Sequence, residues 1–165
     1  MNSNRLREIE NHLSLLREQL VGMEQTKIMA PAEERPRIEQ RMRQELKVPI
    51  RRYEEEYWKI LTSEADSLPI SEPEAEVAIA EIVEQVYQLE LYQPATYSDE
   101  VLQILQSIRD KLNQPGTHAA AKLKGIISSI PPFIGVSYEA ELDTENFFRT
   151  YFPTFTRLIK GVIKK

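Results

Sequence analysis

The chain has 165 residues, and its 26 acidic and 21 basic side chains give a formal net charge of −5 at pH 7. Because it contains no cysteine, disulfide frameworks, thiolate zinc sites and cysteine nucleophiles are excluded, and its five glycines are too few for a protein built of strands and tight turns. We therefore expect an all-α protein, a helical bundle of five to seven helices in which residues 1–165 form a single domain.

Residues 3–29 are predicted to form the first helix. Apolar residues recur along it at alternating spacings of three and four, which is the a/d seam of a coiled coil. The seam consists of Leu6, Ile9, Leu13, Leu16, Leu20 and Met23. A seam of this kind needs a partner helix, and two alternatives remain open: pairing within the chain, or pairing with a second copy or a helix of another protein.

A second helix is predicted over residues 36–62, because Pro31 breaks the first one. Its apolar side continues in phase across Pro49, so we expect this proline to kink the helix and not to end it. The apolar side consists of Ile38, Met42, Leu46, Ile50, Tyr53, Tyr57 and Leu61. Together the two helices are predicted to form a long, antiparallel, coiled-coil-like hairpin over residues 3–62.

Residues 71–113 are predicted to form an acidic pair of helices, with nine acidic and two basic side chains. Ser71 and Glu74 make a capping box at the start of the first helix, and Ser98 is predicted to cap the second. The inward side of the first of these helices is predicted to consist of Val77, Ala80, Val83, Val86, Tyr87 and Leu91.

Residues 117–165 differ from the rest of the chain, since they are basic and rich in aromatic residues. Thr117 is predicted to cap a helix that ends before the Pro131-Pro132 pair. Residues 133–142 are then expected to be extended or irregular.

Two further helices are predicted to begin near Asp143 and Pro153. Apolar side chains and cations come close together in this last part of the chain. The apolar side chains either belong to the core of the bundle or, beside the cations, form a surface for a protein partner or an anionic membrane. The candidates for this partner- or lipid-binding surface are Ile126, Ile130, Phe133, Ile134, Lys160, Lys164 and Lys165.

No motif for catalysis is present. The sequence contains no Gly-rich phosphate loop, metalloprotease helix motif, calcium-binding loop or nucleophile elbow. Glu8 and His12 lie one helical turn apart, but no third metal ligand accompanies them, so a solvated pair is the favoured interpretation. We therefore predict that the protein is not an enzyme and has no catalytic residues, no cofactor, no metal and no small-molecule substrate.

The distribution of charge also bears on partners and location. An acidic middle and a basic end argue against nucleic-acid binding, which favours one strongly basic face. The N-terminus has no apolar signal core, and the longest uncharged stretch, residues 125–138, is too short to span a bilayer. We expect a cytoplasmic protein, with peripheral membrane association under the lipid-binding alternative.

Two parts of the sequence resemble a known kind of module. Ala-Glu-Glu-Arg-Pro at 32–36 and Tyr-Glu-Glu-Glu-Tyr-Trp-Lys-Ile-Leu at 53–61 resemble charged helical hairpins at the front of bacterial, chiefly cyanobacterial, multidomain proteins. Those proteins often carry a NACHT or related STAND-type ATPase with repeat sensors behind it. Four further segments resemble the end of the same sort of effector-associated helical module: residues 122–124, 130–132, 137–145 and 149–155.

The resemblance implies a role in bacterial signalling or defence. Since an ATPase and sensor repeats are missing from this sequence, we expect either a lone module or the N-terminal piece of a longer protein. The leading hypothesis is a non-catalytic adaptor, an effector-associated module that contacts a protein partner, or itself, through helices. The alternative is a cell-death-type helical effector that binds membranes through its basic C-terminal third.

Overall fold

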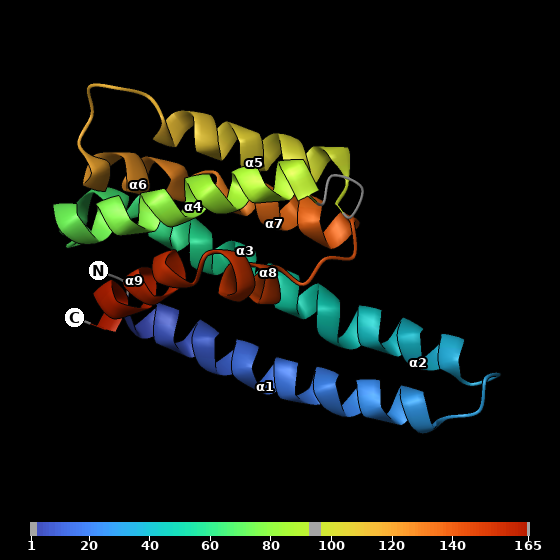
Figure 1. The fold of residues 1–165 in the computed structure, drawn as a ribbon. Helices are drawn as coiled ribbons and strands as arrows, with labels where there is room; N and C mark the ends of the chain where they lie inside the picture. The colour runs from blue at the N-terminus through green and yellow to red at the C-terminus, as the bar shows by residue number, and fades with distance from the viewer. Residues whose placement is uncertain (1–2, 93–96, 165) are drawn as a thin grey trace. The chain divides into compact units, whose positions relative to one another are not determined.

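A computed structural model describes residues 3–92 and 97–164, and within these ranges helices are joined by turns and short loops, with no strand among them (Figure 1). The predicted all-α fold is therefore confirmed. The chain separates into two compact units, residues 2–57 and residues 58–165, and the boundary falls inside helix α3 (Val48–Ser63). Each unit is described below by itself.

The first unit is a helical hairpin. Its first arm is α1 (Ser3–Met29), which has the predicted bounds, and its second arm consists of α2 (Arg35–Arg41), the π-helical segment η1 (Met42–Lys47) and the first part of α3. The two arms run side by side in Figure 1, and α1 contacts both α2 and η1.

The second arm continues through Pro49 as predicted, but the π-helical segment before it was not expected. Proline lacks an N–H, and in an α-helix its ring clashes with the carbonyl group four residues earlier. In η1 the N–H of Val48 donates to the carbonyl oxygen of Arg43, five residues back. The wider turn also suits apolar residues that are spaced four apart. In an α-helix four residues rotate about 40° beyond a full turn, so such residues would drift around the helix. The wider turn keeps one set of apolar residues on the inner side: Met42, Leu46 and Ile50.

The N-terminal half of the a/d seam of α1 is buried within the protein. Leu6, Ile9 and Leu13 are buried, whereas Leu16, Leu20 and Met23 are partly exposed. The prediction that all six residues form a partner-binding surface is therefore wrong for the first three, because their side chains already belong to the core. A hairpin that offers its own second helix satisfies the heptad pattern without another molecule.

Ion pairs join the two arms of the hairpin. The Arg5 guanidinium donates to both carboxylate oxygens of Glu56, from Nε at 2.7 Å and from Nη2 at 2.9 Å. Nearer the tip, Lys27 Nζ lies 2.7 Å from Glu39 Oε1. These hydrogen bonds hold the pKa of Glu56 and the pKa of Glu39 below their ordinary values.

The lowered pKa values predict a loss of stability in acid. Both carboxylates bind protons more weakly in the folded hairpin than in the unfolded chain. Their contribution is therefore complete above the unfolded pKa and is lost as the pH falls through the folded pKa. We expect the melting temperature, followed by circular dichroism, to fall from about pH 5 downward. A Glu39→Gln/Glu56→Gln variant should show a shallower fall, and an unchanged slope would contradict the assignment.

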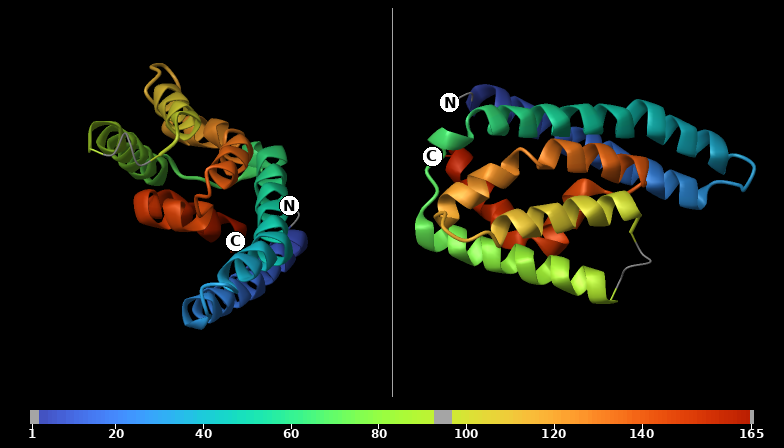
Figure 2. Two further views of the ribbon diagram at one scale, coloured as in Figure 1. Left: turned by 90° about the vertical axis from the view of Figure 1, so that its right-hand side faces the viewer. Right: turned by 90° about the horizontal axis from the view of Figure 1, so that it is seen from above.

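The second unit contains the remaining helices. After the end of α3 and a short 3₁₀ turn, η2 (Ala65–Ser67), come α4 (Glu72–Tyr92), α5 (Asp99–Leu112), α6 (Ala119–Ile127), α7 (Ile130–Glu139), α8 (Thr144–Tyr151) and α9 (Pro153–Lys164). Helix α4 is the central helix of this unit, because α5, α6 and α9 all pack against it (Figure 2). None of the helices in the described ranges reaches the length and apolarity that crossing a bilayer requires.

The predicted helix starts in this unit are largely confirmed. Ser71 Oγ accepts a bond from the N–H of Glu74, and Ser98 Oγ accepts one from the N–H of Val101. Asp143 caps α8 in the same way, through the N–H of Asn146.

The predicted extended or irregular segment over residues 133–142 is wrong for residues 133–139, which belong to helix α7. The proline pair lies in the first turn of α7, directly after Ile130. The N–H groups of a first turn have no partner within the helix, so proline is tolerated there and its fixed φ favours helix. Pro131-Pro132 thus starts a helix as well as ending the previous one.

Helix α7 ends in a Schellman motif without glycine. The N–H of Leu142 bonds to the carbonyl oxygen of Ser137 at 2.8 Å, and the N–H of Glu141 bonds to that of Tyr138 at 3.1 Å. Glu141 itself has a φ of 59°, in the left-handed region that glycine adopts at little cost.

Replacing Glu141 by glycine should therefore stabilise the protein. The left-handed conformation costs a non-glycine residue about 1–2 kcal/mol, part of which glycine loses again through its freer unfolded state. We expect Glu141→Gly to raise the free energy of unfolding by about 0.5–1 kcal/mol in urea denaturation. Glu139→Gly, within the helix, should have the opposite sign, and equal effects of the two changes would refute the motif.

Aromatic rings form the core of the second unit. Phe133 lies 5.4 Å from Phe148 and 5.3 Å from Phe147 between ring centroids, and Trp58 stacks on Phe155 at 6.0 Å. The apolar half of the predicted partner- or lipid-binding surface belongs to this core. Its members are at most 2% exposed, so they do not form a surface in this fold: Ile126, Ile130, Phe133 and Ile134.

Candidate functional site

Helix α4 is apolar on two opposite sides. Its buried side consists of Ala75, Ala78, Ile82, Val86 and Leu89. Of the predicted inward side, Val86 is buried and Val83 is partly buried, but the prediction is wrong for the other four residues, which are exposed: Val77, Ala80, Tyr87 and Leu91. Small alanines on the buried side let neighbouring helices approach closely. The size of an apolar side chain therefore does not indicate which side of the helix is buried.

The outward side of α4 has the pattern of a coiled-coil seam. Six residues follow one another at spacings of 4, 3, 4, 3 and 4, and we call them the α4 stripe: Pro73, Val77, Ala80, Glu84, Tyr87 and Leu91. All six are exposed, with exposed fractions of 60% for Val77, 51% for Tyr87 and 52% for Leu91. Helices that are apolar all round are normally covered on every side. An exposed a/d stripe is therefore a surface suited to another helix.

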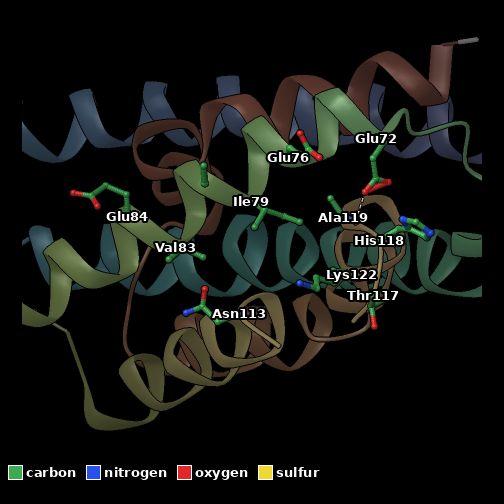
Figure 3. A pocket seen from close by; sticks show the side chains of 11 residues that line it. Glu72, Glu76, Ile79, Val83, Glu84, Asn113, Thr117, His118, Ala119 and Lys122 are labelled. Carbon is green, nitrogen blue, oxygen red and sulfur yellow. Dashed lines mark hydrogen bonds between the residues drawn. The ribbon is translucent and has the colours of Figure 1, made fainter. Parts of the chain in front are cut away.

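A groove runs beside the α4 stripe, between α4 and α6, and encloses about 670 Å³. Figure 3 shows Ile79 and Val83 of α4 directed toward the side where Asn113, Thr117 and Lys122 lie. We call it the α4–α6 groove, and its remaining lining residues are Glu72, Glu76, Ala80, Glu84, His118 and Ala119. Because Ala80 and Glu84 belong to both features, the stripe and the groove form one continuous surface.

One end of the groove is closed by Glu72. Its carboxylate accepts bonds from the backbone N–H groups of Ala119 and Ala120, the first two residues of α6 (Figure 3). Glu72 thereby caps α6 and places a negative charge at the positive end of the helix. The sequence-based expectation that Thr117 caps this helix is wrong, since His118 is the N-cap and its side chain makes no capping bond.

Two more glutamates of α4 have similar positioning roles. Glu81 accepts bonds from the backbone N–H and the hydroxyl of Thr154 at 2.8 and 2.7 Å, at the start of α9. Glu90 forms an ion pair with Arg109 of α5. Successive carboxylates along α4 therefore fix α6, α9 and α5, and part of the acidity of this helix is structural.

The remaining carboxylates of α4 make the surface negatively charged. Glu74, Glu76 and Glu84 are exposed, and within the described residues none of them has a cation at ion-pair distance. Glu84 accepts a bond from the neutral amide of Gln88 at 2.8 Å. Lys122 is the cation that lines the groove, and α4 itself carries six glutamates with no lysine or arginine.

The other predicted site residues are not brought into one place. Lys160 is exposed on α9, whereas Lys165 and the side chain of Lys164 lie outside what the structure describes. Glu8 pairs with Arg5, and the His12 ring packs edge-on against Tyr53 at 5.1 Å, so neither points to a shared metal. In the described ranges no group of three acidic or histidine side chains could hold a metal ion.

Comparisons of this chain with protein-family models, with curated proteins and with solved structures found no match. The resemblance to effector-associated modules of NACHT and STAND-type proteins therefore stays a prediction, carried by the sequence segments alone.

Proposed function

We propose that this protein is a non-catalytic interaction module that binds an amphipathic helix of a partner protein along the α4 stripe. The observation that carries the proposal is the exposed 4-3-4-3-4 pattern on a helix whose opposite side is already buried. A helix needs one apolar side to hold it in a bundle. The second apolar side has no role in the described fold, and a partner helix accounts for it.

The chemistry of the surface supports binding more than catalysis. Three apolar side chains of the stripe are at least half exposed to solvent: Val77, Tyr87 and Leu91. Their burial by a partner would contribute about 1 kcal/mol for each side chain. Glu72, the carboxylate at the end of the groove, is engaged by the backbone of α6. The groove can receive side chains from the edge of the bound helix.

The proposed setting is a bacterial signalling or defence system, in the cytoplasm. This follows the resemblance to effector-associated modules, whose adaptors dock partners by helix contacts. The membrane alternative has less support, because the apolar side chains predicted to contact the lipid are core residues, among them Ile126, Ile130 and Phe133. Cations alone give weak, salt-sensitive attraction to a lipid surface.

Binding of model helices tests this proposal. We would use three labelled peptides of about three heptads, with leucine at a and d and with lysine, glutamine or glutamate at the other positions. Fluorescence anisotropy should detect binding of at least one peptide. Leu91→Ser should weaken that binding about tenfold, which corresponds to about 1.4 kcal/mol.

The matched control is Leu15→Ser on α1, because Leu15 is 57% exposed and Leu91 is 52% exposed. The control should leave the affinity unchanged. If no peptide binds, or if the two variants behave alike, the α4 stripe is not a helix-binding surface.

A further inference from the structure

From the charges that flank the α4 stripe we infer that the bound helix is cationic, with lysine or arginine on both sides of its apolar seam. This inference rests on the proposed function, since it concerns the partner of the same surface. In paired helices the residues beside the seam, at the e and g positions, set the choice of partner by charge.

Every charged residue at a flanking position of the stripe is a glutamate. With Val77 and Glu84 at a and with Ala80 and Tyr87 at d, the flanking glutamates are Glu74, Glu76, Glu81 and Glu90. Glu81 and Glu90 already bind Thr154 and Arg109, respectively. The other two, at the N-terminal half of the stripe, are exposed.

The stripe carries a fifth carboxylate within the seam itself. Glu84 occupies an a position and also lines the α4–α6 groove. A partner helix that covers it removes water from the carboxylate, which is costly unless a hydrogen-bond donor replaces that water, and a positive group supplies both the donor and the opposite charge. A lysine or arginine on the partner can reach Glu84 while its aliphatic stem packs on the apolar part of the stripe.

The same charges disfavour a second copy of α4 as the occupant. Two copies in either orientation would place an acidic helix against an acidic helix, since α4 carries six glutamates and no basic residue. Like charges across a helix pair oppose association. Lys122 is one positive charge among the groove-lining residues, against three glutamates there, so the surface stays negative.

The three peptides distinguish this inference from the proposal on which it rests. The lysine peptide should bind at least about tenfold more tightly than the glutamine peptide, the glutamate peptide should bind weakest, and added salt should narrow these differences. Equal affinities of the three peptides would overturn the cationic partner while leaving a helix-binding surface. Binding of none would overturn both.

Charge reversal on the stripe is the second arm of the experiment. Glu76→Lys/Glu84→Lys should reverse the order of the lysine and glutamate peptides, and both positions are exposed, so the fold is expected to persist. Glu18→Lys/Glu24→Lys on α1 changes the net charge equally at exposed positions and should preserve the original order. If the α1 variant changes the preference as much as the α4 variant does, overall charge and not the stripe governs binding, and the inference fails.

Discussion

Replacing Leu13 by glutamate is expected to unfold the hairpin of residues 2–57. Leu13 is 5% exposed and is the last of the three buried residues of the α1 seam. The substitution removes an apolar contact and puts a carboxylate at a buried position of the apolar seam, which together cost about 3 kcal/mol or more. Circular dichroism at 222 nm should show a lower melting temperature and a loss of helical signal.

The control for this change is Leu15→Glu, two residues further along the same helix. Leu15 is exposed, so this variant introduces the same charge and helix propensity without touching the seam. It should melt within a few degrees of the original protein. Similar melting of the two variants would show that the seam does not face the second arm of the hairpin.

Replacing Phe133 by alanine should have an effect of similar size on the second unit. Phe133 is fully buried, and its ring packs against those of Phe147 and Phe148. Large-to-small changes at such positions leave a cavity and cost about 3–5 kcal/mol. Urea denaturation should show the loss.

Tyr92→Ala provides the matched control, because Tyr92 is 74% exposed at the end of α4. Its effect on the free energy of unfolding should stay within about 0.5 kcal/mol. A mild effect of Phe133→Ala would mean that the aromatic residues of the C-terminal part are not the core, and it would restore them as candidates for a contact surface.

The sequence predicts those parts of the fold that depend on local rules. The bounds of α1 follow from the heptad pattern and the break at Pro31, and the helix starts at Ser98 and Asp143 follow from side chains that cap their own helix. These signals lie within a few residues of the feature they specify. The hairpin follows because two apolar seams are joined by a short break.

The parts that were missed depend on contacts between distant residues. The cap of α6 comes from Glu72, 47 positions before Ala119, and no local pattern indicates such a partner. The end of α7 uses Glu141 in a conformation for which glycine is the usual signal. The proline pair was misinterpreted because a proline that ends one helix also suits the first turn of the next.

The candidate site was missed for a more specific reason. Both sides of α4 carry apolar residues at heptad spacing, so the pattern identifies two seams and does not say which one is buried. The sequence-based choice favoured large side chains such as Val77 and Leu91. Packing by α5, α6 and α9 instead covers the side that contains the two alanines.

The orientation of α4 is the central claim, and thiol labelling tests it most directly. The chain has no cysteine, so Val77→Cys and Val86→Cys each introduce one thiol by the same substitution in the same helix. Val77 is 60% exposed and Val86 is 1% exposed. We expect rapid labelling at position 77, slowed by the bound lysine peptide, and labelling at position 86 only on unfolding. Rapid labelling at position 86 with protection at position 77 would contradict this orientation.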